Sequence, residues 1–314
     1  MMLNIRRFVT DVDEPVWVEV LNAAYKERVD WRAVTVEEML LQEKGDPSFD
    51  LEGRFIAELD GRPVGVVHAN VDKLREERKG FIRFGVIPES HGRGVEQQLI
   101  ETALKELKVR GMTTAQAWVD SEKKDQMWVL EELDFKPVRV FSMMEMDLVD
   151  ISQDIGENKQ VTIRSLQKSL DEDIELFNWL DNESFKEHFN HRPNTLEETR
   201  YHLFSNPYLR EQEVFFAVLN GECVGYIGVV IDEKYNLEKK VKAGDIFTIG
   251  VLKTHRRTGI GARLMLHGLE TLKAKGMTKA MLGVDDYNPT KALALYEKVG
   301  FRAKKKDITF EREL

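Results

Sequence analysis

The sequence predicts an α/β protein with two tandem domains, each built on a mixed sheet flanked by helices. Three observations lead to this prediction. The chain has 314 residues, well above the usual length of one domain. Its pattern recurs at an interval of roughly 160 residues. Within each copy, short apolar runs typical of strands alternate with longer runs that have helical periodicity.

The repeat defines the two copies. The segment at 22–27 returns at 182–187, and the hairpin at 55–65 returns at 216–225 with Asp-Gly and Asn-Gly at the turns. One apolar helix stripe also recurs at a constant offset of 165 residues: Leu99, Ile100, Ala103, Leu104 and Leu107 match Leu264, Met265, Gly268, Leu269 and Leu272. We therefore expect domains at 1–150 and 161–314, with a polar linker at 149–160.

The second copy shows the order of the elements most clearly. A short strand comes first, then two helices, and then the hairpin that contains the Asn-Gly turn: 161–164, 170–187, 195–206 and 214–230. A strand ending near Val251 leads into a long helix that carries the apolar stripe and stops at Gly276. A strand, a further helix and a closing pair of strands complete the copy, the first two at 280–284 and 289–299.

Composition narrows the class of protein. Hydrophobic residues make up 42% of the chain, which is enough for ordinary cores and excludes a disordered chain. The net charge is −9, so nucleic acid is not an expected partner. No apolar run approaches the roughly 18 residues of a membrane span, and residues 1–15 lack a signal-peptide core. With a single cysteine, Cys223, the chain is expected to be cytoplasmic and free of internal disulfides.

The segment at 251–261 lies between a predicted strand and a predicted helix. Backbone N–H groups at such a helix start can hold a phosphate, and Gly259 and Gly261 allow an anion to approach the backbone. Arg256 and Arg257 add positive charge. The spacing differs from the dinucleotide fingerprint and from the nucleotide-triphosphate loop. The alternative is an ordinary strand-to-helix turn that needs glycine.

A second motif lies about 25 residues further on, where Asn288 precedes the run Tyr-Glu-Lys-Val-Gly-Phe at 296–301. Together with Arg256-x-x-Gly259-x-Gly261, it resembles the GNAT superfamily of acyl-CoA-dependent N-acyltransferases. The resemblance covers both copies, and the tandem arrangement is similar to mycothiol synthase and its relatives. It implies two GNAT-type domains, each with a mixed, mostly antiparallel, twisted sheet flanked by helices.

The resemblance also implies acetyl-CoA as co-substrate, with no metal. Backbone groups of Ile249, Gly250 and Val251 would pair with the pantetheine arm, and Asn288 would bond the cofactor, with Tyr287 and Thr290 as weaker contacts. The diphosphate would lie on the loop and first helical turn: Arg256, Arg257, Thr258, Gly259, Ile260, Gly261 and Ala262.

Two residues are candidates for proton transfer. By its family position, Tyr296 would protonate the departing coenzyme sulfur, and the alternative is a tyrosine that packs on the sheet. Asp245 stands where related enzymes place an acidic group that deprotonates the amine, and a bridging water would be needed because aspartate is short. The alternative for Asp245 is an exposed carboxylate at the start of a strand.

The acceptor site is expected on the first two helices of the second copy. Glu183 is the candidate for attracting a cationic amine, with His188 near it; Glu183 could equally lie on a solvated helix face. His188-x-x-His191 suggests a metal, but no third ligand is evident and none is predicted. The expected acceptor is a primary amine, more readily on a small molecule than on a protein, and the expected assembly is a monomer or homodimer.

The two copies differ at the positions that matter for this chemistry. In the first copy His91 replaces the motif arginine and Glu96 replaces the second glycine, which places a carboxylate where a diphosphate would lie. Leu130 stands at the tyrosine position and cannot donate a proton. We expect the first domain to be non-catalytic: it shapes the substrate cleft, holds coenzyme A unproductively, or only stabilises its partner.

The leading prediction is an acetyl-CoA-dependent N-acetyltransferase whose C-terminal domain is catalytic. A non-enzymatic acyl-CoA-binding sensor or assembly protein is the alternative from another class. A protein N-terminal acetyltransferase is a third possibility. The acceptor itself cannot be read from the sequence.

Overall fold

The computed structural model describes residues 2–149, 151 and 155–314. The chain forms two compact units, which we call unit 1 (Met1–Val140 with Asp307–Leu314) and unit 2 (Phe141–Lys306). Residues 150 and 152–154 of the expected linker lie outside the described part. Within that part, every helix is too short or too polar to span a bilayer.

Unit 1 contains the first copy of the repeat. Its helices are α1 (Glu14–Tyr25), α2 (Val36–Gly45), α3 (Val95–Val109) and α4 (Lys124–Glu132), with a short 3₁₀ turn at Pro88–Ser90. Its strands are β1 (Leu3–Arg7), β2 (Arg54–Leu59), β3 (Arg62–Val71), β4 (Lys79–Val86), β5 (Thr114–Asp120) and the last part of β12 (Arg302–Glu313).

Unit 2 contains the second copy. Its helices are α5 (Asp171–Phe185), α6 (Leu196–Phe204), α7 (Glu233–Lys239), α8 (Ile260–Ala274) and α9 (Ala292–Val299), with a 3₁₀ turn at Lys253–His255. Its strands are the last part of β6 (Lys136–Asp147), then β7 (Thr162–Ser165), β8 (Gln212–Leu219), β9 (Glu222–Val230), β10 (Ala243–Val251) and β11 (Lys279–Asp285).

Each unit has a mixed, mostly antiparallel sheet, as the sequence predicted. The strand order is β1-β2-β3-β4-β5-β12 in unit 1 and β7-β8-β9-β10-β11-β6 in unit 2. Only the pairs β4–β5 and β10–β11 are parallel among the pairs with a defined register. The predicted elements of the second copy are confirmed to within a few residues at their ends; α7, between β9 and β10, was not predicted.

The prediction that each copy ends with its own closing pair of strands is wrong. Unit 2 ends its sheet with residues 141–147 of β6, which pair antiparallel with β11. Unit 1 ends its sheet with residues 307–313 of β12, which pair antiparallel with β5. Each copy thus supplies the last strand in the order of the other unit, and the unit boundaries differ from 1–150 and 161–314 for this reason. A local pattern cannot reveal such an exchange, because the sequences of β6 and β12 predict strands but not the strands with which they pair.

The repeat is visible in the side-chain hydrogen bonds as well as in the elements. Both α2 and α6 begin with a capping box, formed by Thr35 with Glu38 and by Thr195 with Glu198. In each copy an arginine six residues before the glutamate pairs with its carboxylate. These matched bonds fix the same connection between the first two helices of each copy.

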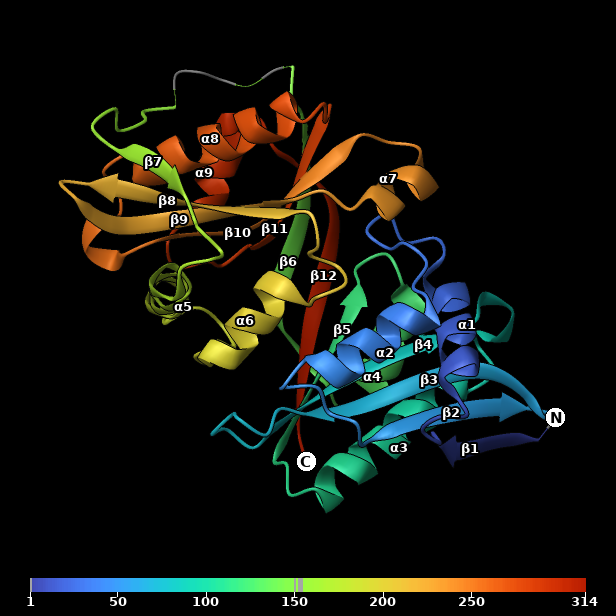
Figure 1. The fold of residues 1–314 in the computed structure, drawn as a ribbon. Coiled ribbons are helices and arrows are strands. Elements are labelled where there is room, and N and C mark those ends of the chain that lie inside the picture. The colour runs from blue at the N-terminus through green and yellow to red at the C-terminus, as the bar shows by residue number, and fades with distance from the viewer. Residues whose placement is uncertain (1, 150, 152–154) are drawn as a thin grey trace. The chain divides into compact units, whose positions relative to one another are not determined.

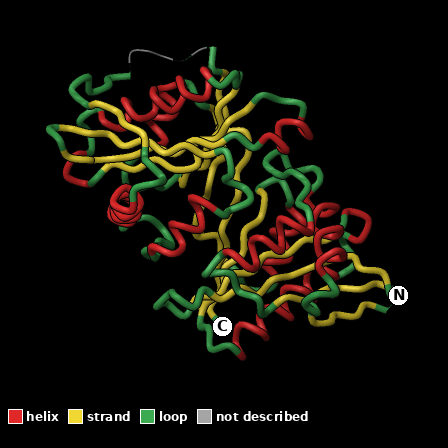
Figure 2. Tube along the Cα trace, in the orientation of Figure 1, coloured by secondary structure: helices red, strands yellow, loops and turns green. Residues whose placement is uncertain are grey.

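Helices cover both faces of each sheet (Figure 1, Figure 2). In unit 2, α8 and α9 pack on one face and α5 and α6 on the other, and each face has its own cluster of buried apolar residues. Unit 1 has the same arrangement, with α3 and α4 on one face and α1 and α2 on the other. The second half of β10 lies between the two apolar layers of unit 2, which is where the candidate site begins.

Candidate active site

The loop between β10 and α8 has the backbone of an anion-binding turn. Gly259 precedes α8 with a left-handed φ of +83°, and Arg257 also has a positive φ of +65°. Among the described residues no side chain caps this helix, so the N–H groups of its first turn are open to an acceptor. Arg257 is exposed in the same turn. This helix end can therefore hold an anion such as a diphosphate.

The fold constrains the two motif glycines, Gly259 and Gly261, to different degrees. A Cβ on Gly259 would lie 2.5 Å from the carbonyl oxygen of Gly156, because the linker backbone packs on this turn. The N–H of Asn158 donates to the carbonyl of Gly259 at 3.1 Å. A Cβ on Gly261 would meet Leu295 at an ordinary contact distance of 3.5 Å. The fold therefore requires glycine at 259, whereas it has room for a side chain at 261.

Arg256 fastens the loop to its surroundings. Its Nε donates to the carbonyl of Val251 at 3.1 Å, and its Nη2 donates to the carbonyl of Ser184 at 2.9 Å. Its Nη1 pairs with Glu187 at 3.2 Å, a carboxylate that Lys253 also contacts at 2.7 Å. Arg256 thus joins the end of β10 to α5 and holds the loop in position.

The strands β10 and β11 part in the middle of the sheet. Their parallel pairing begins at Ala243 with Lys279 and ends at Ile246 with Leu282. Beyond that point β10 continues to Val251 and stays paired with β9 on its other side. In the part of the chain that the structure describes, the edge of β10 that faces β11 therefore has no strand partner over 247–251.

The register shows which backbone groups face this open edge. The N–H of Leu252 donates to the carbonyl of Val224 at 3.0 Å. Because backbone groups alternate in an antiparallel pair, those of Gly250 also point toward β9, and those of Ile249 and Val251 point away from it. Of the three residues expected to contact pantetheine, Ile249 and Val251 face the open edge, and Gly250 does not.

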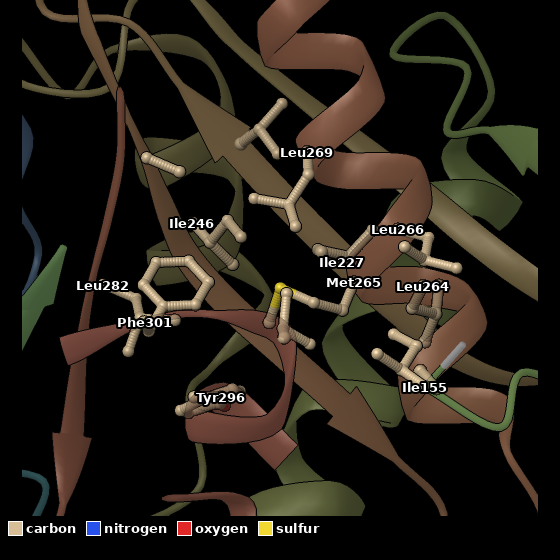
Figure 3. Packing of buried hydrophobic residues seen from close by; sticks show 14 of the residues in the cluster. Ile155, Ile227, Ile246, Leu264, Met265, Leu266, Leu269, Leu282, Tyr296 and Phe301 are labelled. Carbon is tan, nitrogen blue, oxygen red and sulfur yellow. The ribbon is translucent and has the colours of Figure 1, made fainter. Parts of the chain in front are cut away.

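Tyr296 lies on α9, inside the apolar cluster of unit 2 (Figure 3). Its side chain is 6% exposed, and its ring lies 6.2 Å from that of Phe301. Burial raises the pKa of the phenol well above its usual range. The phenol therefore keeps its proton at neutral pH, and this is the state that a proton donor requires. The ring also packs on the sheet, so the structural and the acid roles are compatible.

Asp245 lies on the face of the sheet that α5 covers. Its neighbours Gly244 and Ile246 pack toward α8, so the side chain between them points to the other face. A register shift between Ile246 and Thr248 then brings Thr248 onto the same face as Asp245. The carboxylate therefore shares its face of β10 with the residues beside the open edge.

The surroundings of Asp245 alter its acidity. Burial, with Asp232 nearby, raises the pKa of its carboxyl to about 7. A group with this pKa can accept a proton near neutral pH. Ile249 is four residues further along β10, or roughly 13 Å at the usual rise of a strand. A role as base would therefore require a water relay.

The two expected acceptor-binding residues have different settings. Glu183 pairs with Lys186 at 3.4 Å on the surface of α5, as in the solvated alternative. His188 follows α5, and its pKa is lowered by burial and by Arg256, with Asp285 acting in the opposite sense. These two charges place His188 near the loop and near the end of β11. His188 and His191 belong to no group of three close metal ligands in the described residues.

Asn288 shapes the turn between β11 and α9. Its Oδ1 accepts from the backbone N–H of Thr290 at 2.7 Å and from the hydroxyl of the same residue at 2.6 Å. The oxygen is therefore occupied within the turn, and the amide nitrogen is the donor that the side chain can offer to a ligand. The neighbouring Tyr287 is 64% exposed.

The sequence did not reveal a buried polar pair under the open edge. The hydroxyl of Tyr226 donates to Asp181 at 2.6 Å and lies 3.2 Å from the hydroxyl of Thr248. Burial raises the pKa of Asp181. The matching positions of the first copy, Leu21 and Val66, are apolar. This difference between the copies is the signal that could have revealed the pair.

The corresponding loop of unit 1 keeps the geometry and changes the chemistry. Gly94 precedes α3 with a φ of +78°, close to that of Gly259. His91 Nε2 lies 2.9 Å from the carbonyl of Val86, which repeats the contact of Arg256 with β10. The change that bears on ligand binding is Glu96: its carboxyl is buried in the first turn of α3, where unit 2 has a glycine.

The strand edge of unit 1 also differs. The hydroxyl of Tyr25 donates to the carbonyl of Phe84 at 2.6 Å. Phe84 corresponds to Ile249, and Tyr25 corresponds to Phe185, which has no hydroxyl. The carbonyl that unit 2 leaves on its open edge is therefore occupied in unit 1.

The two catalytic candidates have no counterpart in unit 1. Gly80 and Gly244 occupy the same place, each against a leucine of the following long helix. The next residue is Phe81 in unit 1 and Asp245 in unit 2, and β4 pairs with β3 without a register shift. Leu130, fully buried, stands in place of the phenol.

Comparison with known proteins agrees with this geometry. The model of the family described as "Acetyltransferase (GNAT) family" matches twice, at residues 17–135 and 174–301. The two matches cover both copies of the repeat.

Curated relatives are mycothiol acetyltransferases. That of Streptomyces coelicolor is 32% identical over 134 residues, which are 42% of this chain and 42% of the relative. The chain thus matches less than half the length of this relative. That of Acidothermus cellulolyticus is 26% identical over 261 residues, which are 81% of this chain and 77% of the relative.

A solved structure has the same architecture. A tandem GNAT protein from the clavulanic acid biosynthesis pathway superposes with a TM-score of 0.75 at 14% identity, covering 99% of this chain and 98% of that one. At this identity the likeness establishes the fold.

Proposed function

Because the chain belongs to the acetyltransferase (GNAT) family, we propose that unit 2 transfers the acetyl group of acetyl-CoA to a primary amine of a small molecule. One observation carries the proposal: unit 2 keeps three features that unit 1 has lost. They are the carbonyl of Ile249 on the open edge, whose counterpart in unit 1 is occupied by Tyr25, the turn with Gly261, and the buried phenol of Tyr296.

The residues of unit 2 suit the parts of acetyl-CoA. The open edge of β10 offers the N–H and C=O of Ile249 and the N–H of Val251 to the amide groups of the pantetheine arm. The first turn of α8, with the charge of Arg257, suits the diphosphate, and the N–H groups come from the loop and turn: Thr258, Gly259, Ile260, Gly261 and Ala262. Asn288 adds a donor near the end of β11.

Acetyl transfer forms a bond between the amine nitrogen and the acyl carbon, and the bond from that carbon to the coenzyme sulfur breaks. An N–H of the open edge donates to the acyl oxygen as negative charge develops on it. Tyr296 gives its proton to the departing sulfur, and Asp245 takes the proton of the amine through water. No step in this scheme requires a metal.

The acceptor is proposed from the chemistry on the α5 side of the sheet. A primary amine is mostly cationic at neutral pH and must lose a proton before it attacks. Asp245 and Asp181 provide carboxyl groups on this face, and His188 lies near the loop. The names of the curated relatives support a small-molecule acceptor. Unit 1 is proposed to be non-catalytic, in a cytoplasmic monomer or homodimer.

The test is an assay of the full chain with acetyl-CoA and a panel of primary amines that includes amino sugars, polyamines and a peptide with a free N-terminus. Release of coenzyme thiol and mass spectrometry of the product are measured. We expect acetylation of a small amine, and its loss in Tyr296→Phe but not in the control Tyr25→Phe, whose tyrosine belongs to unit 1. Tight binding of acetyl-CoA without turnover on any amine would favour a sensor, and acetylation of the peptide alone would contradict the acceptor class.

A further inference from the structure

A cluster of potential metal ligands lies in unit 1, at the loop that corresponds to the diphosphate turn of unit 2. His91, Glu96 and Asp125 each offer one ligand atom, and these atoms lie within 4.8 Å of one another. Over the residues that the structure describes, this is the one group of three such side chains found. We propose that this His91 cluster binds a divalent transition-metal cation such as Zn²⁺.

The copies have opposite charge at the positions of the cluster. Relative to the shared helix position of Leu130 and Tyr296, Asp125 corresponds to Lys291. In unit 2 these three positions hold two cationic side chains and a glycine: Arg256, Lys291 and Gly261. In unit 1 they hold an imidazole and two carboxylates: His91, Asp125 and Glu96. The same loop backbone carries a set suited to an anion in one copy and a set suited to a cation in the other.

The hydrogen bonding of His91 leaves one ring nitrogen available as a ligand. Its Nε2 lies 2.9 Å from the carbonyl of Val86, and since a carbonyl only accepts, Nε2 carries the proton. Nδ1 then has the lone pair, and it lies 3.8 Å from Oδ2 of Asp125. Metal-bound histidines typically donate their other ring N–H to a carbonyl or a carboxylate in this way.

Glu96 provides an independent observation that points to a ligand. Its side chain is buried, with 4% of the residue exposed, and Oε1 has no hydrogen-bond partner among the described residues. This oxygen lies 4.0 Å from Nε2 of His91. The charged groups that act on the carboxyl are His91 and Asp125, the other two members of the cluster. A buried carboxylate oxygen without a partner is unfavourable, and a bound cation would supply the partner.

The donor set indicates the class of metal. One imidazole nitrogen and two carboxylate oxygens suit Zn²⁺ and related transition metals better than Mg²⁺, which prefers oxygen ligands alone. Two carboxylates balance the charge of a dication. Ligand atoms around tetrahedral Zn²⁺ lie about 3.3 Å apart. Nδ1 of His91 and Oδ2 of Asp125 are 3.8 Å apart, and the ligand atoms of the three residues all lie within 4.8 Å of one another, so side-chain shifts can bring them onto one ion. Asp125 is half exposed, which leaves the site accessible to water and to the ion.

The site would join three elements of unit 1. His91 belongs to the loop after β4, Glu96 to the first turn of α3, and Asp125 to the first turn of α4. A cation held by all three binds the folded state and not the unfolded chain, so it raises the melting temperature. This effect needs no acetyl-transfer activity, so the proposal can be tested independently of the proposed function.

The test titrates the full chain, freed of metal by chelation, with ZnCl₂ in a calorimeter and with CoCl₂ while the visible absorption of Co²⁺ is recorded. We expect one equivalent per chain, weaker binding of MgCl₂, and a rise in melting temperature with Zn²⁺. Glu96→Gln, His91→Gln and Asp125→Asn should each weaken Zn²⁺ binding at least about tenfold. The glutamine at 91 retains a donor for the carbonyl of Val86.

Two matched controls locate the binding. Glu89→Gln, at an exposed carboxylate in the same loop, and His188→Gln, in unit 2, should leave the Zn²⁺ affinity unchanged. Circular dichroism of the metal-free variants checks their fold, and Asp125→Asn keeps the test valid if the change at the buried Glu96 unfolds unit 1. Absence of Zn²⁺ binding, or binding that survives the changes at 91 and 125, would overturn the proposal.

Discussion

The hydroxyl of Tyr25 donates a hydrogen bond of 2.6 Å to the carbonyl of Phe84. In unit 2 the matching carbonyl belongs to Ile249, and the residue in place of Tyr25 is Phe185. The hydroxyl of Tyr25 thus occupies the carbonyl on the strand edge of unit 1. The matching edge of unit 2 lacks this hydroxyl and can receive an extended ligand. Together with Glu96 and Leu130, this contact explains why two copies of one fold need not bind the same ligand.

The change Phe185→Tyr should close the open edge of unit 2. The new hydroxyl would compete for the carbonyl of Ile249, and the loss of one hydrogen bond from pantetheine corresponds to about a tenfold rise in the dissociation constant of acetyl-CoA. Isothermal titration calorimetry measures this constant, and the melting temperature checks the fold.

Tyr25→Phe is the matched control. It removes the hydrogen bond to Phe84 and should reduce the free energy of unfolding by about 1 kcal/mol, measured by urea denaturation. It should leave the acetyl-CoA affinity unchanged. If Tyr25→Phe weakened acetyl-CoA binding and Phe185→Tyr did not, the open edge would have been assigned to the wrong unit.

Tyr296→Phe should reduce kcat by about 100-fold or more, because the departing sulfur loses its proton donor. The phenyl ring keeps the packing against Phe301, so the affinity for acetyl-CoA should stay the same. Steady-state kinetics and calorimetry separate the two effects. A variant that retained full activity would leave Tyr296 with the packing role alone.

The pH dependence of the reaction should report Asp245. Its pKa of about 7 means that the carboxyl is protonated, and inactive as a base, below that pH. We therefore expect kcat/KM to rise with pH and to level off above about pH 7. In Asp245→Asn we expect kcat/KM to be lower and to show no such rise. An unchanged profile in the variant would assign the inflection to another group.

Asp245 should also affect stability, with a defined sign. Its folded pKa of about 7 lies above the ordinary value of 3.8, so the folded protein binds this proton more tightly than the unfolded chain. The contribution to stability is present below pH 3.8 and is lost as the pH rises to about 7. Urea denaturation at pH 5 and pH 8 should show a smaller decline for Asp245→Asn than for the natural protein.

Gly259→Ala and Gly261→Ala should have unequal effects on stability. Alanine at 259 would have a φ of +83° and a Cβ 2.5 Å from the carbonyl oxygen of Gly156, so unit 2 should lose about 2 kcal/mol or more. Alanine at 261 meets its neighbour at 3.5 Å and should be tolerated. Thermal melts of the two variants measure the difference, and equal losses would argue against the packing of the linker on this turn.

Local patterns predicted the local elements. The apolar stripe and Gly276 predicted α8, and the Asn-Gly turn predicted the β8–β9 hairpin. The exchange of β6 and β12 between the two copies was missed because it depends on pairing between distant segments, such as Ser142 with Val284. The contact of Tyr25 with Phe84 was missed for the same reason, since 59 residues separate them.

The candidate site was predicted unevenly. The motif residues predicted the position of the turn and of Tyr296 in the chain. The pattern could not show that the guanidinium of Arg256 donates hydrogen bonds to the carbonyls of Val251 and Ser184. Burial decides the acidity of Asp245, and burial depends on the whole fold.

The most direct test of the account is the stoichiometry of acetyl-CoA binding to the full chain by calorimetry, with Gly261→Glu beside Glu96→Gly. Position 261 has room for a side chain, so Gly261→Glu places the carboxylate of unit 1 in the turn of unit 2 while the fold is kept. The account predicts one acetyl-CoA per chain, abolished by Gly261→Glu and unaffected by Glu96→Gly. One equivalent that persists in Gly261→Glu would contradict it.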